Sequence, residues 1–332
     1  VPVLASGYLA TGSVSGSLLQ AFNLIVGTMI YIPFIKQSER VQDREFLGKI
    51  KRLEASMNED ERSVWVRDFR WNTYENQQTA KLLASDLEYA LSKGALELYY
   101  QPQVKRDGTL YGCEALLRWN YMGQGFVYPP LIIALAVQGD FIGSLGMYIV
   151  EKACRDMAGA HTQAGCPVSF SVNILPLELE DPSFADHVLR ILKDTGVEGS
   201  NLTIELTEQV ALNPGPNLER QLEKLRESRV RISMDDFGMG HGSLNYLNSA
   251  HYDEVKIDGS LIRRLPEHTQ TCELVGNIMN MSRILGVSTV AECVETPEQI
   301  QMLEKLGCSI YQGYYYSRPL PLDAFIEYVK GL

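Results

Sequence analysis

The segment Val230-Arg-Ile-Ser-Met-Asp-Asp236 is a short run of mostly apolar residues that ends in two adjacent carboxylates. Such a run predicts a buried strand of a parallel sheet, here Val230 to Met234, and places both acids just past its end. A helical pattern, Leu218 to Ser228, precedes the segment. Strand and helix therefore alternate at this point, as they do in a repeated βα unit.

The same alternation extends from Leu82 to the C-terminus. The predicted strands are Leu96 to Val104, Leu110 to Leu116, Val168 to Val172, Leu202 to Ile204, Val230 to Met234, Glu254 to Ile257, Ser288 to Ala291 and Ser309 to Tyr311. The predicted helices are Pro130 to Ala160, Asp181 to Thr195, Leu218 to Ser228, Cys272 to Leu285 and Pro297 to Leu306. A count of about eight strands predicts an α/β fold, specifically a TIM-like (β/α)8 barrel, which commonly takes about 250 residues.

Nearly every predicted strand carries, at or just past its apolar run, a polar residue that a core would not tolerate alone. These residues are Gln101, Glu114, Asn173, Glu205, Asp235, Asp236, Lys256, Asp258, Glu292 and Gln312. In a barrel the carboxyl ends of the strands converge on one face, where the active sites of this fold lie. We therefore expect these acids, amides and the lysine to share one pocket.

Crowded carboxylates favour cations, because two of them about 4 Å apart repel by roughly 4 kcal/mol at an effective dielectric constant near 20. No paired histidine or cysteine accompanies the acids, so oxygen ligands predict Mg²⁺ or Mn²⁺ rather than Zn²⁺. The adjacent Asp235 and Asp236 suit a bridge between two ions. Two-metal sites of this kind stabilise phosphoryl displacement, so phosphodiester hydrolysis is the predicted reaction.

The overall charge limits the class of partner. A formal net charge of -11 opposes binding to a polyanion, which excludes duplex DNA or long RNA as an expected partner. Bound cations can reverse the local sign of an acidic cluster, so a small phosphorylated ligand is still compatible.

An ordered set of motifs resembles one family. The motifs are Tyr100-Gln-Pro-Gln103, Glu114-Ala-Leu-Leu-Arg-Trp119, Val172-Asn173, Glu205-Leu-Thr-Glu208, Asp235-Asp-Phe-Gly238, Val255-Lys-Ile-Asp258, Ala291-Glu-Cys-Val-Glu295, Gln312-Gly313 and Pro319-Leu-Pro321. They resemble those of the EAL domains, whose signature triplet is Glu114-Ala115-Leu116 here, and cover about three quarters of the chain. The resemblance implies a modified barrel that hydrolyses cyclic di-GMP to linear pGpG with two Mg²⁺ or Mn²⁺ ions, and a homodimer formed through the barrel.

The resemblance also implies roles for individual residues. It implies a first metal ion bound by Glu114, Asn173, Glu205 and Asp235, and a second bound by Asp235, Asp236 and Glu292. Lys256 is then expected to orient the attacking water, and Glu292 to assist as general base. Arg118 and Gln101 are expected to contact the phosphate and sugar of the substrate. The substrate pocket is further expected to include Asp258, Glu295 and Gln312, and Glu208 is expected to anchor the loop after Asp236.

Simpler interpretations exist for some of these residues. Lys256 and Asp258 could form an ion pair at a strand end, and Asn173 could be a turn former. Arg118 could pack against Trp119, since arginine stacks on aromatic rings. The loop Met239-Gly-His-Gly-Ser243 departs from the Thr-Gly-Tyr-Ser-Ser that is usual in the family. This difference puts in doubt the family's coupling between dimer contacts and metal binding.

The N-terminal part differs from the rest. Residues 1–36 contain an apolar run, Leu18 to Ile35, close to the roughly 20 residues that span a bilayer. The stretch Leu4-Ala-Ser-Gly-Tyr-Leu-Ala-Thr-Gly12, followed by Leu18 to Lys36, resembles the last membrane helix of the sugar-transporting permease subunit of a phosphotransferase system. The alternative is a buried core helix. Lys36 and Arg40 follow the run, and such basic residues predict that the rest of the chain lies on the cytoplasmic side of the inner membrane. If the run does not span the membrane, the whole chain is expected to be cytoplasmic.

The predicted domains are thus a hydrophobic segment at 1–36, a charged helical linker at 37–78 and the barrel at 79–332. Two alternatives to the phosphodiesterase are a catalytically inactive cyclic di-GMP receptor attached to a membrane protein and a protein interaction module that has lost the ligand. The intact set of acids disfavours the interaction module.

Overall fold

The computed structural model describes residues 74–123, 125–127, 129–165, 167–208, 216–238 and 252–332. The chain divides into two units, Val1–Leu83 and Ala84–Leu332, and the second unit contains the predicted strands. The predicted membrane segment at 1–36 and nearly all of the linker at 37–78 lie outside the described residues. Within the described ranges, no helix is both long enough and apolar enough to cross a bilayer.

The described strands form a closed barrel. Those of the ring are β1 (Glu97–Lys105), β2 (Leu110–Asn120), β4 (Phe170–Asn173), β5 (Leu202–Thr207), β6 (Arg231–Phe237), β7 (Glu254–Ile257), β8 (Ser288–Ala291) and β9 (Ile310–Gln312). The order around the ring is β1-β9-β8-β7-β6-β5-β4-β2, and the pairing of β1 with β2 closes it. Two short strands, β3 (Phe126–Val127) and β10 (Leu320–Pro321), extend β2 and β1. The prediction of a TIM-like α/β barrel is confirmed.

One strand of this barrel runs against the others. β1 pairs antiparallel with both β2 and β9, whereas the remaining neighbours around the described ring pair in parallel. Gln101 lies in the middle of β1, inside the predicted strand Leu96 to Val104. It still reaches the other polar residues, since the register places it directly opposite Glu114.

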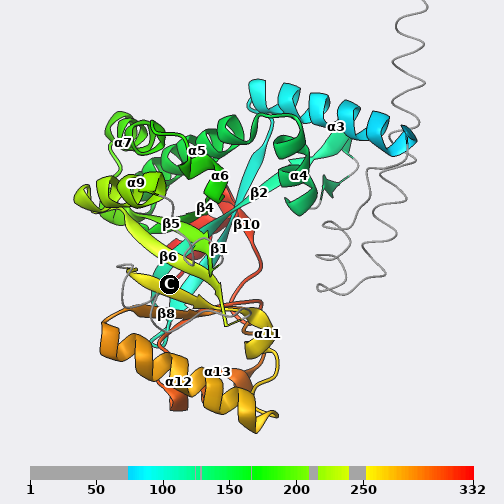
Figure 1. The fold of residues 1–332 in the computed structure, drawn as a ribbon. Helices are drawn as coiled ribbons and strands as arrows, with labels where there is room; N and C mark the ends of the chain where they lie inside the picture. Colours follow the sequence, from blue (N-terminus) through cyan, green and yellow to red (C-terminus); the bar gives the residue numbers. More distant parts are fainter. Residues whose placement is uncertain (1–73, 124, 128, 166, 209–215, 239–251) are drawn as a thin grey trace, which may run out of the picture. The chain divides into compact units, whose positions relative to one another are not determined.

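Helices cover the outside of the barrel. Their bounds are α3 (Tyr74–Ser92), α4 (Pro129–Gln138), α5 (Ile142–Ala164), α6 (Pro176–Leu179), α7 (Phe184–Thr195), α9 (Pro216–Glu227), α11 (Gly259–Ile262), α12 (Thr269–Leu285), α13 (Pro297–Leu306) and α14 (Leu322–Lys330), with 3-10 turns η2 (Tyr121–Gly123) and η3 (Gly199–Asn201). In Figure 1, α5, α7 and α9 lie on one side of the strands and α12 and α13 on the other. The core is therefore formed by the apolar residues of the short strands and the inner faces of these helices.

The predicted helix Pro130 to Ala160 is wrong in one respect, because the structure has two helices there. α4 ends at Gln138 and α5 begins at Ile142. Between them Asp140 has a φ of 59°, in the left-handed region that a right-handed helix cannot contain. The break falls at the exposed Gln138-Gly139-Asp140, a local turn signal that the prediction of one helix passed over.

Capping hydrogen bonds fix the start of α13, the helix that follows β8. The Thr296 hydroxyl accepts a hydrogen bond from the Gln299 N–H at 3.3 Å, and the Gln299 side chain accepts one from the Thr296 N–H at 3.0 Å. This reciprocal capping, with Pro297 at the first helical position, fixes the start of α13 where the sequence predicted it. The chain between Glu292 and α13 is short as a result.

Candidate active site

A buried lysine lies at the centre of the acidic residues. The ammonium nitrogen of Lys256, on β7, lies 2.8 Å from Glu292, 3.0 Å from Glu205 and 3.2 Å from both Glu114 and Asp235. The Lys256 side chain is only 1% exposed. Four negative charges against one positive charge leave a formal charge of -3 if all four acids are ionised. This cluster therefore has a strong need for additional positive charge.

Glu114 is held from both sides by amides. Its Oε1 atom accepts a hydrogen bond from Asn173 Nδ2 at 2.7 Å, and its Oε2 atom accepts one from Gln312 Nε2 at 2.6 Å. The second oxygen also faces Lys256. The carboxylate plane is thus fixed, and Asn173 acts on Glu114 directly rather than as a simple turn former.

The adjacent acids of β6 form a second group with Glu292. One oxygen from each of Asp235, Asp236 and Glu292 lies within 4.8 Å of the others. Asp236 has a φ of 56°, in the left-handed region, at the end of β6. This backbone conformation allows two consecutive residues to direct their carboxylates to the same place, which an extended strand would not permit.

Burial and charge change the pKa values of these acids. Burial, and then the neighbouring Asp235 and Asp258, raise the pKa of Asp236 to about 6. Burial, with Asp235 and Glu114 nearby, raises the pKa of Glu292 to about 8 despite Lys256. Burial likewise raises the pKa of Glu205 well above its ordinary value. Protons, or cations in their place, therefore stabilise the cluster.

For Glu114 and Lys256 the surroundings favour the charged form instead. Burial alone would raise the pKa of Glu114, but Lys256 and the hydrogen bonds from Gln312 and Asn173 lower it. Burial would lower the pKa of Lys256, but the surrounding carboxylates hold it well above its ordinary value. Glu114 is thus an ionised carboxylate beside a permanently charged lysine.

Arg118 lies beside the cluster. Its guanidinium lies 5.6 Å from the centre of the Tyr99 ring and donates to the Leu117 carbonyl at 2.8 Å. Trp119 instead packs edge-on against Tyr121, 5.0 Å between ring centroids. The alternative of an Arg118–Trp119 packing pair is therefore not what the structure contains.

Three other predicted residues have distinct positions. The Asp258 carboxylate accepts the Ser260 N–H at 2.8 Å and caps α11, while Lys256 pairs with other acids. Glu295 is exposed, and its backbone N–H donates to Gln299 at 2.8 Å. The carboxylate of Glu208 accepts the Gly238 N–H at 3.3 Å, so it contacts the chain just after the Asp235-Asp236 pair. The loop 239–251 itself lies outside the described residues.

One site residue escaped the sequence-based prediction. Gln103 is 3% exposed, and its Nε2 donates to Gln312 Oε1 at 2.9 Å. Gln101 and Gln103 are two residues apart on β1, so both point to the same face of the strand. Two amides at this spacing in a largely buried strand were the signal that could have identified Gln103.

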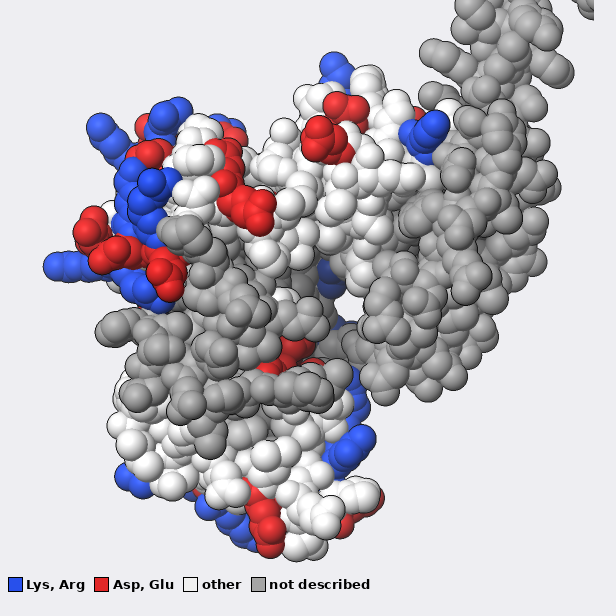
Figure 2. Space-filling view, in the orientation of Figure 1, with Lys and Arg blue, Asp and Glu red and all other residues white. Residues whose placement is uncertain are grey.

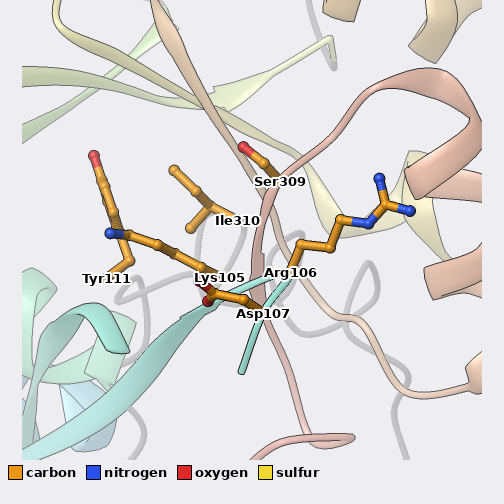
Figure 3. Close-up of a pocket in the computed structure, with 6 residues that line it drawn as sticks. All are labelled: Lys105, Arg106, Asp107, Tyr111, Ser309 and Ile310. Atoms are coloured by element: carbon orange, nitrogen blue, oxygen red, sulfur yellow. The ribbon is translucent and has the colours of Figure 1, made fainter. Parts of the chain in front are cut away.

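The opposite end of the barrel has a separate pocket of about 530 Å³, lined by Lys105, Arg106, Asp107, Tyr111, Ser309 and Ile310. Figure 3 shows Arg106 pointing away from Tyr111, and its guanidinium pairs with Glu304 at 3.2 Å. The polar groups of this pocket do not converge. Acidic side chains are instead visible in the hollow at the centre of the face in Figure 2. The acidic cluster is thus the better candidate for chemistry.

The fold and the cluster define an α/β-barrel protein with an acidic, cation-attracting site at the carboxyl ends of its strands. The EAL domain family model matches residues 84–319, and the chain belongs to the EAL domain family. The chain is 35% identical over 250 residues to the cyclic di-GMP phosphodiesterase NbdA of Pseudomonas aeruginosa, covering 75% of this chain and 32% of NbdA. It is 31% identical to the cyclic di-GMP phosphodiesterase RocR of the same species, covering 74% of this chain and 63% of RocR.

A solved structure has the same fold. The PaMucR phosphodiesterase in complex with cyclic di-GMP superposes with a TM-score of 0.69 at 34% identity, covering 74% of this chain and 99% of that one. The chain spans about a third of the length of NbdA and less than two thirds of RocR. The match is therefore one of the barrel, not of these whole proteins.

Proposed function

We propose that this chain hydrolyses cyclic di-GMP to linear pGpG with the help of two Mg²⁺ or Mn²⁺ ions. The observation that carries the proposal is the convergence of Glu114, Glu205, Asp235 and Glu292 on Lys256. The family and the named activities of NbdA and RocR support the same reaction.

The residues present fit divalent cations. Glu205 Oε1 is buried and has no hydrogen-bond partner among the described residues. Asn173 commits its Nδ2 to Glu114, so its carbonyl oxygen is available as a ligand. All candidate donors are oxygens, which suits Mg²⁺ or Mn²⁺. Glu114, Asn173, Glu205 and Asp235 would hold one ion, and Asp235, Asp236 and Glu292 the other.

When bound, these ions would neutralise the acids, polarise the phosphodiester and make water more acidic. The attacking water oxygen forms a new bond to phosphorus as the bond to one ribose 3′ oxygen breaks, which opens the ring to pGpG. Lys256 would orient the attacking water, Glu292 would assist as the general base that takes its proton, and the departing 3′ oxygen would take a proton from solvent.

The neighbouring residues are proposed to bind the substrate. Arg118 is half-buried, and a guanidinium binds phosphate oxygens in a bidentate manner. Gln101, with Gln312 beside it, would contact a sugar. Asp258 and Glu295 lie on the chain that follows β7 and β8, where they would complete the pocket wall, and Glu208 would anchor the loop after Asp236 through Gly238.

We also propose the wider arrangement of the chain. The apolar residues 18–35 would cross the inner membrane, residues 37–78 would link them to the barrel, and the barrel, from residue 79 on, would act in the cytoplasm as a homodimer. The apolar run and the basic residues that follow it support this topology.

The decisive experiment incubates the purified 332-residue chain with cyclic di-GMP and Mn²⁺ and follows the nucleotides by chromatography. Formation of pGpG, stopped by chelation of the metal, is the expected result. Binding of cyclic di-GMP without any linear product would instead identify a receptor. Absence of both binding and product would reject the nucleotide as a ligand.

A further inference from the structure

We infer that Gln103 is a positioning residue, which sets the direction of the Gln312 amide and through it the orientation of the Glu114 carboxylate. The inference rests on the proposed function, because Glu114 is a metal ligand only in that reaction. Gln103 belongs to none of the groups of predicted ligands or substrate contacts. It acts on Glu114 indirectly, through its hydrogen bond to Gln312.

The backbone places Gln103 between two neighbouring strands. It lies opposite Gln312 in the pairing of β1 with β9 and opposite Gly112 in the pairing with β2. A Cβ atom at Gly112 would lie only 3.3 Å from Gln103 Oε1 and 2.9 Å from the Ser169 carbonyl oxygen. The absence of a side chain at Gly112 thus leaves room for the buried amide of Gln103.

The amides form a chain of hydrogen bonds with one direction. Gln103 Nε2 donates to Gln312 Oε1 at 2.9 Å. The nitrogen of Gln312 then donates to Glu114 Oε2 at 2.6 Å and to Gln101 Oε1 at 3.3 Å. Gln101 Nε2 in turn donates to the Ser317 carbonyl at 3.2 Å. Gln312 and Gln101 therefore each accept a hydrogen bond from the amide before them and donate to the group after them.

Reversal of the Gln312 amide would disrupt its hydrogen bonds with Glu114, Gln101 and Gln103 at once. Its oxygen would face the Glu114 carboxylate, an acceptor against an acceptor, and its nitrogen would face the nitrogen of Gln103. Both contacts are buried, where an unmatched polar group is costly. Without the Gln103 donor, Gln312 Oε1 would lack this partner, so the amide would lose one of the groups that fix its direction.

Glu114 is the group that responds. Gln312 and Asn173 hold opposite oxygens of its carboxylate, so the amide of Gln312 fixes how Glu114 presents itself to a cation. Loss of a hydrogen bond that orients a metal ligand typically lowers metal affinity or activity by about 10- to 100-fold. Loss of the Gln103 donor should therefore weaken metal binding and lower kcat.

The test compares four variants of the 332-residue chain by calorimetric titration with Mn²⁺ alone and by turnover of cyclic di-GMP. Gln103→Met keeps the length of the side chain and removes the donor. Val104→Ala is the matched control, because Val104 is 1% exposed on the same strand but points to its opposite face. Gln312→Met, alone and with Gln103→Met, shows whether the first residue acts through the second.

We expect Gln103→Met to weaken Mn²⁺ binding by about tenfold and to lower kcat similarly. Val104→Ala should lower the unfolding temperature without weakening Mn²⁺ binding, and the double variant should match Gln312→Met. The inference is overturned if Gln103→Met binds Mn²⁺ like the parent, or if the two substitutions have additive effects. A parent that binds Mn²⁺ but makes no pGpG would refute the proposed function instead, and the Mn²⁺ titrations would still decide the role of Gln103.

Discussion

The ammonium nitrogen of Lys256 lies 2.8 Å from Oε1 of Glu292, and the same nitrogen pairs with three further carboxylates. Glu292 carries a pKa of about 8 in spite of this contact, because its burial and the other acids outweigh the single lysine. The cluster is therefore stable only with added protons or cations. This imbalance of charge, and the packing around it, have consequences that can be measured.

Substitution of Lys256 by Met should destabilise the metal-free protein by roughly 3 to 5 kcal/mol, because buried carboxylates lose the cation that faces them. Urea unfolding in the presence of a chelator measures the loss, and Mn²⁺ should restore part of it. Lys224→Met is a suitable control, since its pair with Asp186 is exposed and worth about 0 to 1 kcal/mol. Equal losses in both variants would contradict the central role of Lys256.

Substitution of Glu114 by Gln should lower the turnover of cyclic di-GMP by at least about 100-fold, because it removes one negative charge from the proposed metal site while keeping the shape. The fold should persist, since the barrel strands and helices do not depend on this charge. Chromatography of the products and circular dichroism measure the two effects. A variant that keeps a rate near that of the parent would refute the assignment of Glu114 as a ligand.

Affinity for Mn²⁺ should depend on pH, because the cation must displace protons from its ligands. The pKa values of about 8 for Glu292 and about 6 for Asp236 set the range. Between pH 8 and pH 6 the cation displaces one proton, so the affinity should fall about tenfold for each unit by which the pH is lowered. Below pH 6 the cation displaces a second proton and the fall should be steeper. Above pH 8 the affinity should be constant. Calorimetric titrations from pH 5.5 to 9 would record this curve. A flat profile would contradict it.

Calcium should inhibit turnover when added to the Mn²⁺-loaded protein, because its larger and less regular coordination shell places ligands at longer distances. Binding of cyclic di-GMP should survive, since Arg118 and Gln101 are not proposed to bind the metal. The initial rate at increasing Ca²⁺, with binding followed in parallel, distinguishes the two. Full activity in excess Ca²⁺ would argue against a geometry that depends on small cations.

A buried acid away from the site should make stability depend on pH. Burial raises the pKa of Glu178, on α6, from 4.5 to about 7. The native state thus keeps a proton that the unfolded state releases between these values, so the free energy of unfolding falls as pH rises through this range. The loss, complete above pH 7, amounts to roughly 3 kcal/mol, because each pKa unit corresponds to about 1.4 kcal/mol.

Glu178→Gln should therefore be more stable than the parent by roughly 2 to 3 kcal/mol at pH 8 and nearly equal to it at pH 5. The neutral amide can still accept the Leu175 N–H that Glu178 Oε2 accepts at 2.8 Å. Urea unfolding at the two pH values measures the difference. A benefit of equal size at both pH values would exclude ionisation as the cause.

Much of the barrel could be predicted from the sequence, because its strands are short and buried. Each of the eight predicted strands overlaps a strand of the described structure, and α13 has the predicted bounds Pro297–Leu306. Apolar runs between turns, and capping residues at helix starts, act over a few residues and are therefore visible in the chain. The polar residues at the ends of those runs also indicated a common site.

Other features depended on residues far apart in the sequence. The antiparallel pairing of β1 with β9 and the inclusion of Gln103 in the site were not predicted. The short connection between β1 and β2, with Asp107-Gly108, is a local signal for an antiparallel hairpin, whereas the pairing of β1 with β9 joins distant parts of the chain. Gln103 and Gln312 are 209 residues apart and meet only through the pairing of β1 with β9.

The sequence by itself therefore determined the kinds of chemistry available: an acidic set of oxygen ligands, one lysine and a barrel to carry them. The tertiary structure alone decided how these groups share their charges. It placed a single buried ammonium among several carboxylates and set the direction of the amides that hold Glu114. The physical reason is that composition and periodicity fix which groups are present and buried, whereas charge pairing and hydrogen-bond direction depend on distances of about 3 Å.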